Sequence, residues 1–235
     1  MANTYFQFKE FRVDQENAAM KVCTDSCVFG ALIKPQGFKN ILDIGTGTGL
    51  LALMLAQRSD ALIDAVEIDD EASSQAKKNI LNSPWSDKIT VYAQSIQDFS
   101  ATTDKKYDLI ISNPPFYSNH LKSEDEKVNT ALHSTSLSIE NLLEAVTKLL
   151  LPEGLFMVLL PPYEAELLRE EAIEYNLFTS SIVKIKDNEK SKVLREITVF
   201  SYDLNIPSVA DFVIKKEDQY TEEFVQLLKK YYLHL

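Results

Sequence analysis

The sequence is poor in the residues that bind structural metals. It has two cysteines and three histidines among 235 residues. Cys23 and Cys27 are four residues apart, which is not the spacing of a zinc site, and no histidine lies near them in the sequence. We therefore expect no metal site. On a helix the two cysteines would share a face, and we interpret them as small buried thiols in a reducing compartment; a redox pair is the alternative.

Long hydrophobic runs are also absent. No apolar run approaches the roughly 18 residues that a membrane-spanning helix needs, and the first residues lack the basic and then apolar order of a signal peptide. We expect a cytoplasmic protein with no membrane contact. The content of 45% hydrophobic and 25% charged residues is that of an ordinary globular protein. The oligomeric state stays open, with a monomer slightly favoured.

Positive charge is scarce in the chain as a whole. The formal net charge is −11, from 24 Lys and Arg against 35 Asp and Glu, which argues against non-specific binding to nucleic acid. One segment, residues 180–195, differs because it carries five cations and only two acids. Such a segment forms either a solvated sheet edge or, if other signals point to an anionic substrate, a binding patch. Its cations are Lys184, Lys186, Lys190, Lys192 and Arg195.

Short apolar runs alternate with stretches of helical periodicity from residue 40 onward. The helical stretches have apolar residues at i, i+3, i+4 spacing, and the apolar runs are short enough for buried strands. This alternation predicts an α/β fold with a mostly parallel sheet and helices on both faces. The expected strands are 40–44, 62–68, 88–93, 107–112 and 155–161, and the expected helices are 49–58, 70–82, 139–150 and about 163–175.

The two ends of the chain add smaller elements. At the N-terminus we expect an edge hairpin over 5–13 and a helix over 24–33, capped by Thr24 or Asp25. After the core, 178–186 and 193–202 predict an antiparallel hairpin that ends the sheet, followed by an extended stretch at 211–216 and a helix near 221–232. The length favours one domain, with an N-terminal part (1–38), a sheet core (39–202) and a C-terminal extension (203–235). The longest irregular stretch is about 118–137, and such loops are usually functional or mobile.

The first parallel strand ends in a glycine-rich turn, "DIGTGTG". Gly45, Gly47 and Gly49 are spaced G-x-G-x-G, and Leu50 stands where the dinucleotide fingerprint would need its last glycine. Glycines at this point let a ligand lie directly on the backbone, in the crevice at the carboxyl ends of the strands. The carboxylate of Asp43 beside that crevice suits an ammonium or sulfonium group better than phosphates.

An acid ends the second strand, where a nucleoside ribose is held in folds of this type. Glu67 follows Gly45 by 22 residues and can accept hydrogen bonds from both ribose hydroxyls. The glycine turn and this acid together indicate S-adenosyl-L-methionine in preference to NAD. For Asp69 and Asp70, at the start of the next helix, stabilisation by the helix dipole is the better explanation.

The fourth strand ends in Asn113, Pro114, Pro115 and Phe116, on the same edge as the glycine turn. The nitrogen of a planar amine or amide has a delocalised lone pair and attacks a methyl donor poorly. The Asn113 side-chain oxygen and the Pro114 carbonyl can accept its two N–H bonds and aim the lone pair at the methyl group. The prolines fix these acceptors, and Phe116 offers a ring for stacking. The alternative explanation of these four residues is a strand end followed by a proline-rich turn with no role in catalysis, and it is less favoured.

These motifs resemble a known family. "NPPF" with "DIGTGTG" looks like the Rossmann-like class I S-adenosylmethionine-dependent amino-methyltransferases, whose seven-stranded, mostly parallel sheet has an antiparallel last strand. The N-terminal "FQFKEFRVDQENAAMKVCTDSCVFGAL", with "AVEID", "NSPWSDKI" and "YDLIISNPPF", resembles the bacterial methyltransferases that modify N6 of adenine-37 in the anticodon loop of valine tRNA. The likeness extends to the C-terminal "YTEEFVQLLKKYYL".

The resemblance implies roles for individual residues. It places Gly45 and Gly47 on the methionine side of S-adenosyl-L-methionine, Glu67 on its ribose, and Asn113 to Phe116 on the target nitrogen. Relatives usually offer an acid to the cofactor adenine at the end of the third strand, where this chain has Ser95; Asp98 is the alternative for that contact. The full set of expected cofactor-binding residues is Asp25, Asp43, Gly45, Gly47, Gly49, Glu67, Ser95, Ile96 and Asn113, and Tyr117 joins the five cations of 180–195 as expected substrate-binding residues.

Three functions remain open from the sequence. The first is methylation of adenine N6 in tRNA, with the cations of 180–195 and the 118–137 stretch holding the RNA backbone. The second uses the same four residues on another NH2 group, either a glutamine side chain of a protein or a base of rRNA. The acidic net charge suits a protein substrate, but no additional N-terminal helical domain for one is present. The third is a non-catalytic scaffold, which the intact Asn113, Glu67 and glycine turn argue against.

Overall fold

The computed structural model describes residues 3–16, 21–114 and 137–235. Its main feature is one nine-stranded sheet, and the N-terminal segment forms a separate two-stranded hairpin. Across the large sheet the strands follow the order β5 (Ile89–Ala93), β4 (Leu62–Glu67), β3 (Asn40–Ile44), β6 (Tyr107–Ser112), β7 (Leu150–Leu160), β9 (Val193–Ser201), β8 (Phe178–Asn188), β10 (Ser208–Lys216) and β11 (Gln219–Tyr220).

The central part of the sheet is parallel, as the alternation of strands and helices predicted. β3 pairs in parallel with β4 and β6, and β5 and β7 extend the parallel array on either side. β9 is antiparallel to both β7 and β8, which confirms the antiparallel strand expected of a seven-stranded core. The 178–202 hairpin does not end the sheet, because the outer edge of β8 pairs in parallel with β10 and β11 then pairs with β10.

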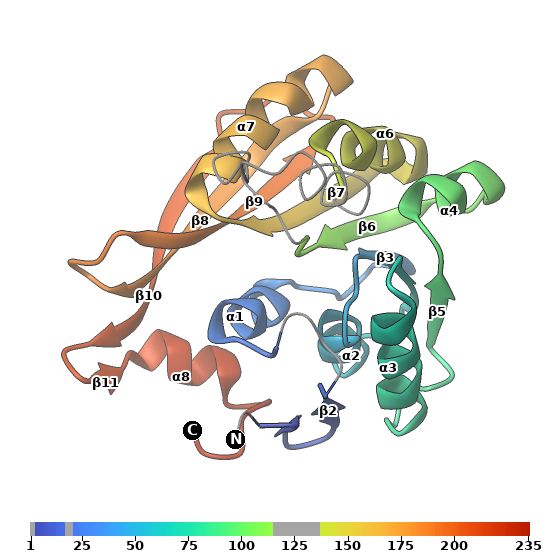
Figure 1. Cartoon of the computed structure of the whole chain (residues 1–235). Coiled ribbons are helices and arrows are strands. Elements are labelled where there is room, and N and C mark those ends of the chain that lie inside the picture. The colour runs from blue at the N-terminus through green and yellow to red at the C-terminus, as the bar shows by residue number, and fades with distance from the viewer. Residues whose placement is uncertain (1–2, 17–20, 115–136) are drawn as a thin grey trace, which may run out of the picture.

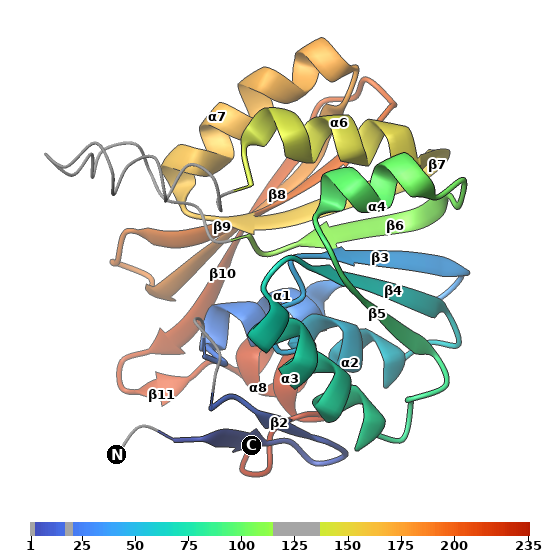
Figure 2. The ribbon, with the colours of Figure 1, turned by 45° about the vertical axis from the view of Figure 1, so that its right-hand side comes forward.

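Helices cover both faces of the sheet, as Figures 1 and 2 show. Each face has its own hydrophobic core, so the sheet is buried on both sides over its parallel part. One face carries α1 (Thr24–Leu32), α2 (Leu50–Ala56), α3 (Asp70–Leu81) and α8 (Glu222–Leu228), and the other carries α4 (Ile96–Thr102), α6 (Ile139–Leu149) and α7 (Pro162–Ala172). None of the helices in the described residues is sufficiently long and apolar to cross a lipid bilayer.

Two local predictions need correction. The helix α4 was not expected, because only Ile96 and Phe99 are large apolar residues in its sequence. The N-cap of α1 is Cys23 and not Thr24 or Asp25, and its side chain makes no capping hydrogen bond. Both cysteines are free thiols; Cys27 is buried, as expected, whereas Cys23 at the helix start is only half-buried.

The N-terminal hairpin, β1 (Tyr5–Gln7) with β2 (Arg12–Asp14), packs on the rest of the protein through apolar side chains and a backbone bond from Lys9 to Tyr231, and a buried amide adds a further link. Asn79 of α3 is 2% exposed. Its Nδ2 donates to the carbonyl oxygens of Asp14 and Thr48, both at 2.9 Å, and its Oδ1 accepts from the Asp14 amide at 3.0 Å. Because Thr48 belongs to the glycine turn, this single side chain joins the hairpin, the turn and α3.

We predict that Asn79→Ala lowers the free energy of unfolding by about 2–4 kcal/mol, because it removes a partner from the buried Thr48 carbonyl, at roughly 1–3 kcal/mol, and from the partly buried amide and carbonyl of Asp14, at less each. Urea denaturation measures the change. Asn82→Ala, at an exposed position just after α3, is the control and should change the stability by less than about 0.5 kcal/mol. Equal effects of the two substitutions would contradict the proposed link.

Candidate active site

The carboxyl ends of three neighbouring strands meet at one edge of the sheet. The amides of Gly45 and Thr46, just after β3, donate to the Val66 carbonyl of β4 at 2.8 and 3.2 Å. On the other side of β3, the hydroxyl of Ser112 at the end of β6 donates to the Ile44 carbonyl at 2.8 Å. These bonds bring the glycine turn, Glu67 and Asn113 to the same edge, where the sequence predicted that they meet.

Glu67 is fixed beneath the glycine turn. The Gly47 amide donates to its Oε2 at 2.8 Å and the Asp69 amide donates to its Oε1 at 3.0 Å, and the residue is 8% exposed. A carboxylate can accept about four hydrogen bonds. The two backbone amides therefore orient Glu67 without using up its capacity to accept from two adjacent hydroxyl groups.

The first two glycines of the turn differ from the third. Gly45 and Gly47 have φ values of +71° and +57°, and a Cβ added to either would meet no atom within 4 Å. Gly49, with φ +82°, begins α2, and an added Cβ would lie 3.4 Å from Ile80 of α3. Gly45 and Gly47 thus present bare backbone to open space, whereas Gly49 faces the packing between helices. A direct cofactor contact of Gly49 stays a prediction.

Asp43 is completely buried at the end of β3. Its Oδ2 accepts from the Thr46 hydroxyl at 2.6 Å, and its Oδ1 has no hydrogen-bond partner within the described part of the chain. Burial raises the pKa of Asp43 to about 7, and the nearby charge of Glu67 contributes to the increase. A buried acceptor without a partner, next to an open turn, suits a cationic or N–H-bearing ligand.

The end of β6 carries the amide that the sequence assigned to the target nitrogen. Asn113 Nδ2 donates to Ser26 Oγ at 2.9 Å, and Pro114 is buried. Since the amide nitrogen donates to Ser26, the amide oxygen is the atom that can accept from an amine. Sequence reasoning missed Ser26, because the two residues are 87 positions apart and no local pattern connects them. The predicted Pro115, Phe116 and Tyr117, and all but the last residue of 118–137, lie outside the described residues.

Besides the bond between Ser26 and Asn113, the first turn of α1 also contacts β9. Asp25 Oδ2 lies 3.2 Å from Arg195 Nε of β9, and Asp25 Oδ1 accepts from the Ser26 amide at 3.0 Å. The sequence assigned Asp25 to the cofactor and Arg195 to the substrate, and the structure places the two side chains against each other. Their separate ligand contacts stay predictions.

At the end of β5, Ser95 is the N-cap of α4. Its Oγ accepts from the Asp98 amide at 3.0 Å and donates to Asp98 Oδ2 at 2.7 Å. Ile96 is 5% exposed and packs in the core between the sheet and its helices. The roles of Ser95 and Ile96 at the cofactor stay predictions. Asp69 caps α3 by accepting from the Ala72 amide at 2.7 Å, which confirms its assignment to the helix start.

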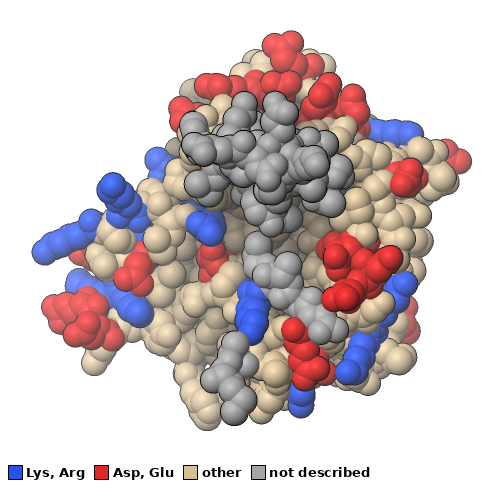
Figure 3. Space-filling model, viewed as in Figure 1, with Lys and Arg blue, Asp and Glu red and all other residues tan. Residues whose placement is uncertain are grey.

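The cations of the β8–β9 hairpin are not all available for an anionic ligand. Lys186 forms an ion pair with Asp211 of β10 at 2.5 Å, and Lys184 lies in register between Glu196 and Asp211. Lys190 and Lys192 are exposed at the hairpin turn. Figure 3 shows Lys and Arg side chains gathered over this end of the molecule.

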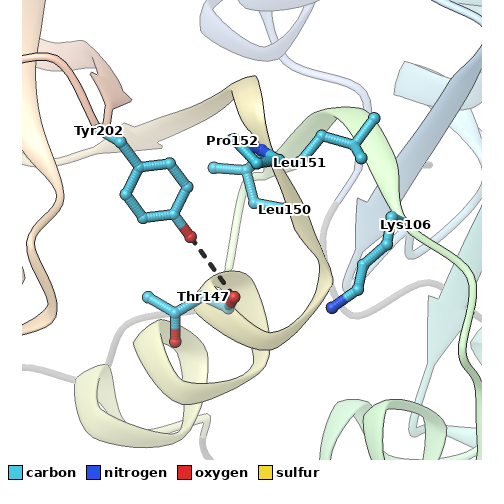
Figure 4. Close-up of a pocket in the computed structure, with 6 residues that line it drawn as sticks. All are labelled: Lys106, Thr147, Leu150, Leu151, Pro152 and Tyr202. Atoms are coloured by element: carbon cyan, nitrogen blue, oxygen red, sulfur yellow. Dashed lines mark hydrogen bonds between the residues drawn. The ribbon is translucent and has the colours of Figure 1, made fainter.

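A hollow elsewhere on the protein is a poor candidate for the active site. Figure 4 shows its lining, where the Tyr202 hydroxyl donates to the Thr147 carbonyl at 3.4 Å. It lies where β6 and β7 begin, about 20 Å from their carboxyl-end edge for a strand of six residues. The lining residues are Lys106, Thr147, Leu150, Leu151, Pro152 and Tyr202. Over residues 3–16, 21–114 and 137–235, no cluster of three acidic, His or Cys side chains could hold a metal ion.

A mostly parallel sheet with the antiparallel strand β9, a glycine turn after β3, an acid at the end of β4 and an Asn-Pro strand end are together typical of a Rossmann-like methyltransferase. The family model described as "Methyltransferase small domain" matches residues 19–158. Solved structures agree on the fold. A predicted O-methyltransferase from Agrobacterium tumefaciens has a TM-score of 0.64 at 15% identity, covering 87% of this chain and 95% of its own. A methyltransferase from Pyrococcus furiosus has a TM-score of 0.59 at 20% identity, covering 83% of this chain and 90% of its own.

Curated relatives narrow the family. Proteins named tRNA1(Val) (adenine(37)-N6)-methyltransferase are 44% identical in Cytophaga hutchinsonii and 41% identical in Bacteroides thetaiotaomicron, over 100% of both chains in each case. The protein of that name from Pectobacterium carotovorum is 41% identical over 98% of this chain and 94% of its own. The chain belongs to the tRNA1(Val) (adenine(37)-N6)-methyltransferase family, as the resemblance of its motifs implied.

The methyl donor of this family of folds is S-adenosyl-L-methionine, and the residues present fit it. Gly45 and Gly47 leave open space where a ligand can lie on the backbone. Glu67 keeps acceptor capacity for ribose hydroxyls, and the unpartnered Asp43 Oδ1 suits the cationic end of the molecule. When bound, the cofactor supplies an electrophilic methyl group on a sulfonium.

The pKa of Asp43 generates a testable dependence of stability on pH. Its pKa rises on folding from 3.8 to about 7. The folded state therefore binds the proton of Asp43 more tightly than the unfolded state, and protonation favours folding. That stability is present below about pH 3.8 and is lost as the pH rises towards 7. We predict that Asp43→Asn reduces the fall in melting temperature of the cofactor-free protein between pH 5 and 7.5. Scanning calorimetry of both proteins at matched ionic strength measures it; parallel curves would contradict the assignment.

Proposed function

We propose that this protein transfers a methyl group from S-adenosyl-L-methionine to N6 of adenine-37 in the anticodon loop of valine tRNA. The names of its full-length relatives support the substrate. The observation that carries the chemistry is the orientation of the Asn113 amide, whose nitrogen donates to Ser26 at 2.9 Å. We extend the proposal to a cytoplasmic location, since tRNA is modified there in bacteria.

Asn113 and Pro114 act by holding the target amine. The N6 group of adenine has two N–H bonds, and the Asn113 side-chain oxygen with the Pro114 carbonyl can accept both. When both N–H groups donate hydrogen bonds to these acceptors, the lone pair of N6 is less delocalised into the ring. The lone pair is then directed to the methyl group. No general base with a raised pKa is needed, because the methylated nitrogen is cationic and gives its proton to water.

Binding a base in the pocket has a low cost for this substrate. A base of the anticodon loop is already partly unstacked, so presenting it to a pocket costs less than extracting one from a duplex. Phe116 and Tyr117 are proposed to stack on it. Lys190 and Lys192, exposed at the β8–β9 turn, and the 118–137 stretch are proposed to hold the RNA backbone.

The first test uses purified protein with methyl-labelled S-adenosyl-L-methionine and three substrates. These are valine tRNA transcript, the same transcript with adenine-37 replaced by guanine, and total protein. We expect label only in the first transcript, recovered as N6-methyladenosine. Label in protein would favour a protein substrate such as a glutamine side chain, and label in neither would leave a base of rRNA or a non-catalytic scaffold.

Asn113→Ala is predicted to abolish transfer while leaving cofactor affinity almost unchanged, because the proposed main role of the amide is to hold the target amine. If the expected contact of Asn113 with the cofactor is also strong, the affinity will fall as well. We expect a loss of at least 100-fold in the methylation rate, the order of effect when an essential positioning contact is removed. The dissociation constant of S-adenosyl-L-homocysteine, from calorimetric titration, should stay within about threefold. Activity equal to that of the wild type would refute the mechanism.

Charge reversal at the hairpin turn tests the RNA contact. The double substitution Lys190→Glu and Lys192→Glu should weaken tRNA binding and reduce the slope of log affinity against log salt by about 0.7–0.9 for each phosphate that the protein no longer neutralises. Lys77→Glu with Lys78→Glu, at exposed positions of α3, is the matched control. Filter binding at several salt concentrations measures both. If the two double variants behaved alike, the hairpin would be only a solvated edge.

A further inference from the structure

We infer that Ser26 is a positioning residue that fixes which end of the Asn113 amide faces the target amine. This inference rests on the proposed function, since it concerns the acceptor in that reaction. Its basis is the hydrogen bond of 2.9 Å between Asn113 Nδ2 and Ser26 Oγ, at a serine that is 4% exposed.

The two ends of an amide side chain are nearly equal in size but opposite in hydrogen bonding. The amide oxygen accepts hydrogen bonds from an amine. The amide NH2 group can only donate, and so it would face the N–H groups of N6 with no acceptor. A rotation of 180° would thus replace an attraction with a repulsion at the atom that must be held. A hydroxyl can also donate, so Ser26 selects the productive orientation only when its own hydrogen is engaged elsewhere and its oxygen is left to accept from the NH2 group.

Ser26 can perform this role because α1 is held firmly in place. At the far end of the helix, the Arg58 guanidinium donates to the carbonyl oxygens of Ala31 at 3.0 Å and Gly30 at 2.5 Å. Gly30 also allows α2 to approach closely, since an added Cβ would lie 2.7 Å from Met54 Sδ. At the near end, the contact of 3.2 Å between Asp25 and Arg195 ties the first turn to β9.

A second group lies beside the hydroxyl. Cys23 Sγ is 3.0 Å from Ser26 Oγ, and we take the Ser26 hydroxyl to donate to this sulfur, which leaves its oxygen to accept from Asn113. Both partners of Ser26 are thus supplied by the protein, one from the start of its own helix and one from the end of β6. This arrangement leaves the hydroxyl oriented in the absence of substrate.

Ser26→Ala is the first test, with Ser100→Ala as the matched control. Ser100 is also a buried helical serine, 7% exposed, whose hydroxyl donates to the Gln97 carbonyl in α4. We expect Ser26→Ala to lower kcat for methylation of valine tRNA about tenfold, with KM for tRNA and the dissociation constant of S-adenosyl-L-homocysteine within about twofold. Ser100→Ala should leave kcat within about twofold. Ser26→Thr, which keeps the hydroxyl, should recover kcat to within about threefold of wild type.

A second measurement does not depend on activity. In the ¹⁵N-labelled wild-type protein, the side-chain NH2 signals of Asn113 can be assigned by their loss in Asn113→Asp. We expect nuclear Overhauser contacts from these protons to the side chain of Ser26. Absence of those contacts, or equal kcat for Ser26→Ala and Ser100→Ala, would overturn the inference. If wild-type protein itself methylated no tRNA, the proposed function would fail while the spectroscopic result would still decide the contact.

Discussion

The parallel pairing of β3 with β4 on one side and β6 on the other is the constraint on which the site depends. Parallel strands end at the same edge, so residues that are far apart in the sequence are forced together there. The register pairs Ile44 with Val66 and with Ser112, which aligns the starts of the glycine turn, Glu67 and Asn113. Because the strands are buried on both faces, a shift in register would place apolar side chains wrongly in both cores, and this stabilises the alignment.

The site combines this edge with an element from outside the central sheet. In the first turn of α1, Ser26 accepts a hydrogen bond from Asn113 and Asp25 pairs with Arg195. One helix thus contacts the ends of two different strands. The other end of α1 is held by Arg58, which lies just after α2. Lys190 and Lys192 are exposed at the β8–β9 turn, whereas Lys186 pairs with Asp211; the turn is therefore the part of this acidic protein that we propose for RNA.

The sequence predicted the strands better than the contacts between them. Residues 40–44 and 107–112 were predicted with their exact bounds, because each is a short apolar run with clear polar or turn residues after it. The short α4 was missed, and Ser95, which caps it, was assigned only to the cofactor. The extension of the sheet by β10 was also missed, since nothing local specifies which edge an extended segment joins. The contact between Ser26 and Asn113 depends on tertiary packing over 87 residues, which no spacing rule covers.

The most direct test of the account is a crystal structure of the protein with S-adenosyl-L-homocysteine. We expect the ribose hydroxyls within about 3.2 Å of the Glu67 carboxylate, the amino acid portion beside Gly45 and Gly47, and the sulfur on the side of the site that the Asn113 oxygen faces. A ligand bound in the hollow beside Tyr202, or one that leaves Glu67 without a ribose contact, would contradict it.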